Sequence, residues 1–80
     1  MAKTEVKSPL PGTFYRRPSP DEPEYKKVGD KVAKGDILGL VEVMKTYTEI
    51  TAEVDGTIAS FAAENEDAVT PGQLLAEIET

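Results

Sequence analysis

Lys45 is the one residue in this chain whose type and position together point to chemistry. It lies at the centre of Glu42-Val43-Met44-Lys45-Thr46, and no other lysine follows Lys34. Apolar, strand-like runs flank it on both sides, so its amine falls at a junction between them. A single amine at such a junction is a candidate for covalent attachment of another group. An unperturbed lysine has a pKa of about 10.4, so a partner enzyme would have to deprotonate it or bring an activated acyl group.

Two other interpretations compete with attachment at Lys45. In the plainer one, Lys45 is a solvated surface lysine and Met44 fills the core. In the other, the chain is an enzyme that uses carboxylates such as Glu42, Glu49 and Asp55 as acid and base. No nucleophile–base arrangement accompanies these carboxylates, and the chain has no cysteine and no histidine. We therefore predict a protein on which chemistry is done, with no catalytic residues and no metal site of its own.

Composition narrows the class of protein further. Eighty residues are enough for one small domain, predicted to span residues 1–80 and to be monomeric in isolation. The net charge of −6, with Arg16-Arg17 and Lys26-Lys27 as the only adjacent basic pairs, argues against nucleic acids and anionic membranes as partners. No apolar run reaches bilayer length, and Met1 to Ser8 lacks the apolar stretch of a signal peptide, so the expected compartment is the cytoplasm.

The chain consists of two similar halves. The landmarks of the first half are a Gly-Thr pair at Gly12 and a later glycine, Gly35, which comes three residues after a valine and opens an apolar run. The second half repeats them at Gly56 and Gly72. The first pair of landmarks is offset by 44 residues and the second by 37, so the first half holds seven extra residues.

The surplus falls at Arg17-Pro18-Ser19-Pro20-Asp21-Glu22-Pro23, where three prolines block a strand ladder and predict a protruding, semi-rigid loop. Taken alone, such a loop is most often a tolerated surface insertion.

The remaining sequence predicts strands separated by turns. The expected strands are Thr4–Ser8, Gly12–Tyr15, Ile37–Val43, Thr46–Val54, Gly56–Phe61 and Leu74–Glu79. From Thr46 to Val54 the residues alternate in a way that is typical of a strand with one solvated face. The even positions hold Thr46, Thr48, Ile50, Ala52 and Val54, and the odd positions hold Tyr47, Glu49, Thr51 and Glu53. Only 59–66 has any helical character, and it is too short to predict a helix. The fold class is therefore all-β: a flattened β-barrel or sandwich of two quasi-symmetric four-stranded halves.

A hairpin between the two central runs would make Met44 and Lys45 a two-residue turn. Such turns require positive φ angles and favour Asn-Gly or Gly-X, which Met-Lys does not supply. If this turn forms, its backbone carries strain on the order of 1–3 kcal/mol for each unfavourable residue. Strain of this kind clusters at functional sites, and the turn would hold the lysine clear of the surface.

With these residues in view, the sequence resembles the biotinyl domain of biotin carboxyl carrier proteins of the acetyl-CoA carboxylase type. The likeness runs from about Val6 to Glu79. It is carried by Glu42-Val43-Met44-Lys45, by 8–16, by Pro18-Ser19-Pro20-Asp21, by 28–32 and by Lys34-Gly35-Asp36. The resemblance implies a barrel-sandwich hybrid fold of the biotinyl/lipoyl kind, with biotin amide-linked to Lys45. It also implies that 17–23 is the "thumb", a loop lying near the biotin ring.

The resemblance further implies a function and partners. A biotin protein ligase would attach biotin, a biotin carboxylase would load a carboxyl group, and a carboxyltransferase would pass it to an acyl-CoA. The expected acyl-CoA is acetyl-CoA, for fatty acid synthesis. Two positions of the motif depart from the family, which has Ala at Val43 and Met at Thr46; both bear on which enzymes recognise the carrier. In the thumb, Arg17 stands where relatives often have Thr.

Two rivals share the expected fold. A lipoyl carrier usually has Asp before its lysine, whereas this chain has Met44, and lipoyl domains lack the inserted loop; Thr46 is the one lipoyl-like feature. The second rival is an interaction module that carries no cofactor at all, and it predicts that no ligase modifies the chain.

Overall fold

The computed structural model describes residues 2–19 and 21–80 and consists of strands and turns. The strands are β1 (Lys3–Lys7), β2 (Gly12–Tyr15), β3 (Lys31–Val32), β4 (Ile37–Val43), β5 (Thr46–Thr51), β6 (Gly56–Phe61), β7 (Asp67–Val69) and β8 (Leu74–Glu79). They form two antiparallel four-stranded sheets, in the orders β1-β8-β6-β3 and β5-β4-β2-β7. No helix of the described residues is long and apolar enough to cross a membrane.

The two sheets are related by the internal duplication. Exchanging β1 with β5, β2 with β6, β3 with β7 and β4 with β8 converts one sheet order into the other. Each sheet therefore takes two strands from each half of the sequence, so neither half can bury its apolar face without the other. The predicted fold class is confirmed, and the sheets prove to be interleaved products of both halves.

Backbone hydrogen bonds repeat with the same symmetry. Ser8 N donates to Gln73 O at 2.9 Å, and Gly72 N donates to Ser8 O at 2.8 Å. At the symmetry-related position Ala52 N donates to Asp36 O at 2.9 Å, and Gly35 N donates to Ala52 O at 2.8 Å. These bonds take Ser8 and Ala52 out of the ladders, which is why β1 ends at Lys7 and β5 at Thr51. The predicted strand ends at Ser8 and Val54 were wrong for this reason.

The core lies between the sheets. Its largest fully buried side chains are contributed by β2, β4, β6 and β8, and they are Phe14, Leu38, Val41, Ile58, Leu75 and Ile78. Gly39 lies beside the ring of Phe14, where a Cβ atom would come within 2.6 Å of Cε1, so the close packing of β2 on β4 depends on that glycine. The even positions Ile50, in β5, and Ala52, just after it, are buried, as the alternation predicted.

The shortest strands were not predicted. β3 has two residues and β7 has three, too few for an alternating pattern. Both follow a tight turn with positive φ: Gly29 in the first half (φ 94°) and Glu66 in the second (φ 71°). In each turn an aspartate carboxylate accepts a hydrogen bond from the backbone three residues earlier, Asp30 from Lys27 N and Asp67 from Glu64 N. The turns therefore hold these short strands in place.

Candidate functional site: a lysine turn beside a groove

Met44 and Lys45 form the two-residue turn of the β4–β5 hairpin. Val43 pairs with Thr46 across it, and both turn residues have positive φ, 50° for Met44 and 66° for Lys45. These angles are those of a type I′ turn, which the right-handed twist of the strands favours although the residue types do not. The predicted strained turn is thus present. Neither side chain packs against the core; Met44 is 93% exposed, so the interpretation of Met44 as a core residue was wrong.

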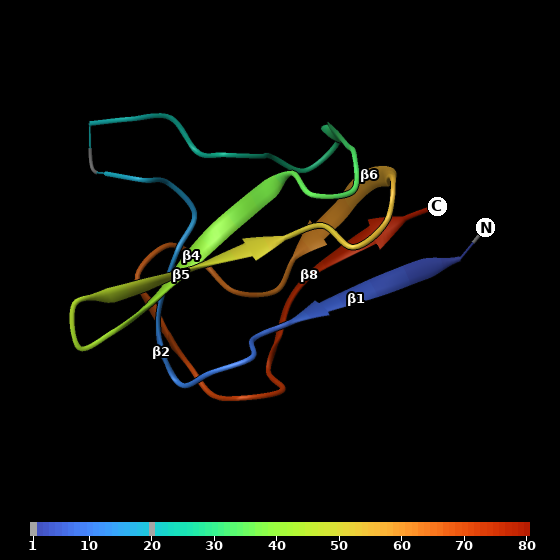
Figure 1. Ribbon diagram of the computed structural model, residues 1–80. Helices are drawn as coiled ribbons and strands as arrows, with labels where there is room; N and C mark the ends of the chain where they lie inside the picture. Colours follow the sequence, from blue (N-terminus) through green and yellow to red (C-terminus); the bar gives the residue numbers. More distant parts are fainter. Residues whose placement is uncertain (1, 20) are drawn as a thin grey trace.

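The turn lies at the far end of the molecule from both chain ends. Figure 1 shows the ends side by side at one edge, and the β4–β5 turn on the opposite side. Thr80 N donates to Ala2 O at 2.9 Å, which ties the ends together. A group on Lys45 would therefore be held at the opposite side of the domain from the two chain ends.

An aromatic pair lies on the outer face of the same sheet. The rings of Tyr15 and Tyr47 have centroids 6.5 Å apart, and Tyr15 OH donates to Glu42 Oε1 at 3.3 Å. Partial burial, and next the nearby Glu42 carboxylate, raise the pKa of Tyr15 above its usual 10.0, because both disfavour the phenolate. Tyr15 therefore remains a neutral donor at physiological pH and orients Glu42 beside the turn.

The segment after β2 forms a loop that leaves the sheets and returns, at the upper left of Figure 1. Its two ends are tied together: Tyr25 N donates to Arg16 O at 2.9 Å, and Arg16 Nη2 donates to Lys26 O at 3.4 Å. Arg16 also stacks on Phe61, with Cζ 3.9 Å from the ring centroid. Asn65 Oδ1 accepts a hydrogen bond from Arg16 N at 2.8 Å, which fixes the base of the loop to the β6–β7 turn.

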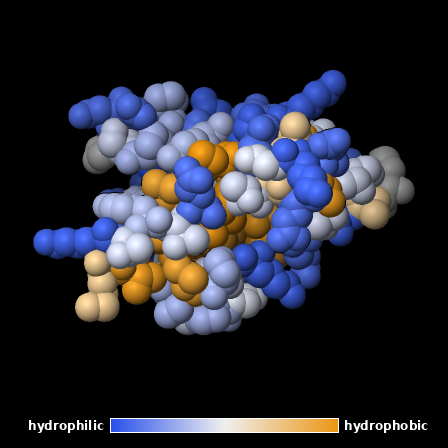
Figure 2. All heavy atoms as spheres, in the orientation of Figure 1, coloured by the Kyte–Doolittle hydropathy of each residue, from blue (hydrophilic) through white to orange (hydrophobic). Residues whose placement is uncertain are grey.

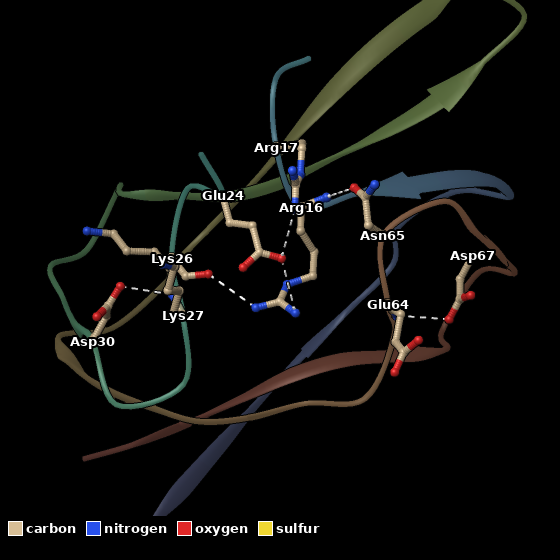
Figure 3. A network of polar contacts seen from close by, with 9 residues as sticks. All are labelled: Arg16, Arg17, Glu24, Lys26, Lys27, Asp30, Glu64, Asn65 and Asp67. Atoms are coloured by element: carbon tan, nitrogen blue, oxygen red, sulfur yellow. Dashed lines mark hydrogen bonds and ion pairs between the residues drawn. The ribbon is translucent and has the colours of Figure 1, made fainter. Parts of the chain in front are cut away.

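Glu24 holds both arginines of the loop base. One of its oxygens, Oε2, lies 3.4 Å from Arg16 Nη1 and 3.7 Å from Arg17 Nη2, as the dashed lines in Figure 3 show. The Arg16 and Glu24 side chains are mostly buried, at 17% and 20% exposed. Shared ion pairs that are partly shielded from solvent restrict side chains more than exposed ones do. The loop base is consequently a defined structure.

A groove of about 640 Å³ lies between this loop and the outer face of β4 and β5. The outline of the molecule is indented there in Figure 2, between the loop and the hairpin end. The lining residues come from β2, the loop, the β4–β5 hairpin and the β6–β7 turn: Tyr15, Arg17, Pro18, Ser19, Leu40, Tyr47, Asn65 and Glu66. Because Tyr47 is two residues from Lys45, the near end of the groove lies about 7 Å along β5 from the backbone of Lys45.

The residues predicted for the site divide into three groups. Lys45, Met44 and Thr46 are exposed at the turn, while Glu42 and Val43 are half-buried in β4. Arg17, Pro18 and Ser19 line the groove. The exposed residues Asp21, Glu22 and Pro23 do not line it, although Glu22 N donates to Ser19 O at 3.1 Å and closes a turn there. Pro20 lies outside the described residues.

Sequence reasoning missed five groove residues: Tyr15, Leu40, Tyr47, Asn65 and Glu66. They come from four separate segments that only the sheet pairing brings together. Tyr47 alone gave a usable signal, because it is an aromatic residue on the polar, outward face of a predicted strand; it is 57% exposed.

Residues 4–78 match the family described as "Biotin-requiring enzyme". The chain belongs to that family. A biotin carboxyl carrier protein of acetyl-CoA carboxylase from Arabidopsis thaliana is 55% identical over 60 residues, which cover 75% of this chain and 24% of that protein. The protein of the same name from Streptococcus pyogenes is 44% identical over 73 residues, which cover 91% of this chain and 44% of it.

Among solved structures, the urea carboxylase of Kluyveromyces lactis contains a similar domain. The two superpose with a TM-score of 0.80 at 28% identity, over 99% of this chain and 6% of that one. This chain thus spans less than half the length of these relatives. The family and fold implied by the resemblance are confirmed.

Proposed function

We propose that this chain is a biotin carboxyl carrier domain, with biotin joined by an amide bond to Lys45. In this proposal the domain, residues 1–80, is not a catalyst. It carries a carboxyl group from a biotin carboxylase to a carboxyltransferase that acts on an acyl-CoA, for which we favour acetyl-CoA. A biotin protein ligase is the partner that modifies Lys45. A cytoplasmic site of action remains a prediction, because the relatives include chloroplastic and bacterial proteins.

The observation that carries the proposal is the presentation of Lys45. Its amine stands on a turn whose positive φ angles are imposed by the hairpin, at the end of the molecule opposite the chain ends. A ligase needs an amine that it can surround and deprotonate, and an exposed turn provides one. The relatives named as biotin carboxyl carrier proteins align over most of this chain, and Met44 precedes the lysine as in the motif of the family that the sequence resembles.

The residues around the turn fit a bicyclic ligand on a flexible arm. Biotin supplies a ureido nitrogen that accepts a carboxyl group. Tyr15 and Tyr47 offer flat apolar faces, and the polar atoms of Ser19 and Asn65 line the same groove. We infer that the loop 17–23 is the thumb, of which Arg17, Pro18 and Ser19 contact the ligand. Tethering raises the effective concentration of the cargo at each enzyme, so the domain works without dissociating its cofactor.

Intact mass spectrometry tests attachment. The chain is co-expressed with a biotin protein ligase and excess biotin, beside Lys45→Arg as the matched control. We expect one biotin increment in the parent and none in the variant. No increment with the biotin ligase, but a lipoyl increment with a lipoate ligase, would establish the lipoyl rival. Absence of both increments would establish an unmodified interaction module.

Deletion of residues 17–23 tests the thumb. Arg16 and Glu24 flank the deletion, and the strands lie outside it, so we expect the fold to persist. Carboxylation of the biotinylated domain by a biotin carboxylase, followed by transfer, is then compared with that of the parent. Unchanged rates with both enzymes would remove the loop from the proposed function.

A further inference from the structure

Arg17 has hydrogen-bonding capacity that the described residues do not use. A guanidinium offers five N–H donors, yet the Arg17 side chain makes no hydrogen bond to another described residue. Its Nε is buried without a partner, and its ion pair with Glu24 is long, at 3.7 Å. The Nε of Arg16 is likewise buried without a partner among the described residues, but Arg16 donates from Nη2 to Lys26 O and stacks on Phe61. Arg17 is thus the loop arginine available to a ligand.

Arg17 is the one cationic residue among the described residues that line the groove, where the other charged residue is Glu66. Two guanidiniums share a single Glu24 oxygen at the loop base. The Arg17 side chain is 35% exposed and lines the groove with Tyr15 and Tyr47. A guanidinium beside aromatic faces matches a planar ligand that ends in a carboxylate, since Arg pairs with that group through two parallel N–H donors.

We propose that Arg17 binds the carboxylate of the cargo carried on the Lys45 arm, so that the groove retains the loaded arm in preference to the unloaded one. This inference rests on the proposed function, because it takes the arm to be joined to Lys45. The ligand class is a planar carboxylate, and the consequence is that the cargo stays shielded while the domain moves between enzymes.

Glu66 gives the groove a means of release. It lines the same groove, and its backbone is fixed by a hydrogen bond from Glu66 N to Phe14 O at 2.6 Å. No ion pair joins Glu66 to Arg17 within the described part of the chain, so its negative charge opposes an incoming carboxylate. Attraction by Arg17 and repulsion by Glu66 together keep the loaded arm bound weakly enough to leave.

The absence of cysteine allows a test that needs neither biotin nor a ligase. In Lys45→Cys the new thiol is the only one in the chain, and it is alkylated with a flexible arm that ends either in a benzoate or in the neutral benzamide of the same shape. Two-dimensional ¹H–¹⁵N NMR then follows the Asn65 side-chain amide and the Tyr47 backbone amide. Arg17→Gln is compared with Lys31→Gln, which removes the same charge from β3, away from the groove.

We expect the benzoate arm to shift both resonances and the benzamide arm to shift them less. Arg17→Gln should abolish the benzoate-specific shift, Lys31→Gln should keep it and Glu66→Gln should enlarge it. Arg17→Lys retains the charge without the planar guanidinium, so it should keep part of the benzoate-specific shift. It serves as the second variant if Arg17→Gln does not fold. Equal shifts from the two arms, or a benzoate shift that survives in both Arg17 variants at full size, would overturn the proposal. Because no biotin is involved, either result is independent of whether Lys45 is a ligase substrate.

Discussion

The Met44-Lys45 turn should be a reservoir of strain, and replacing it with Asn-Gly should stabilise the protein. Both residues have positive φ, at 50° and 66°. For residues with a Cβ this region costs roughly 1–2 kcal/mol each, whereas Asn tolerates it and Gly has no such penalty. The new glycine in turn lowers the free energy of unfolding by about 0.5–1 kcal/mol, because it gives the unfolded chain more conformational freedom. The expected net gain for Met44→Asn with Lys45→Gly is about 2 kcal/mol.

Urea unfolding followed by circular dichroism measures this gain. A domain of this size has an m-value of about 1 kcal/mol per M, so the midpoint should rise by about 2 M at unchanged m. The control is Met44→Ala with Lys45→Ala, which removes the same side chains but keeps a Cβ at both positions. Since neither side chain is buried, we expect the control to stay within about 0.5 kcal/mol of the parent. An Asn-Gly variant no more stable than the Ala-Ala control would refute the argument from strain.

Three further predictions follow from the turns and the core. Glu66→Gly should stabilise the protein by about 1 kcal/mol in urea unfolding, because Glu66 holds a φ of 71°; a loss of stability would contradict this. Gly39→Ala should lower the free energy of unfolding by about 1–3 kcal/mol, since the new Cβ would overlap the Phe14 ring, and a neutral result would show that β4 can shift. Asp36 accepts a hydrogen bond from Ala33 N at 2.9 Å, and chiefly this bond lowers the pKa of Asp36 below its usual 3.8. The carboxylate therefore stabilises the fold above that pH, and the stabilisation is lost as the pH falls through the folded-state pKa. The stability difference between the parent and Asp36→Asn should shrink from pH 7 to pH 3, and a difference independent of pH would rule this role out.

Local signals in the sequence were enough to predict most of the strands. Gly12–Tyr15, Ile37–Val43, Gly56–Phe61 and Leu74–Glu79 have the predicted bounds, because each is an apolar run that starts at or just after a glycine turn. β3 and β7 carry too few residues for any periodicity, and their pairing with β6 and β2 is imposed by the turns that precede them. The ends of β1 and β5 depend on hydrogen bonds to residues in the other half, which no local pattern encodes.

The sequence by itself determined the duplicated all-β scaffold, the inserted loop and the singular position of Lys45, since glycine spacing, proline content and residue counts are local properties. The tertiary structure alone decided three things. Pairing of β4 with β5 imposes positive φ on Met44 and Lys45 against their intrinsic preference. Interleaving of the two halves distributes each half over both sheets. The return of the loop to the sheet face sets Arg17 beside Tyr47, thirty residues away in the chain, and only folding can create a groove from such distant residues.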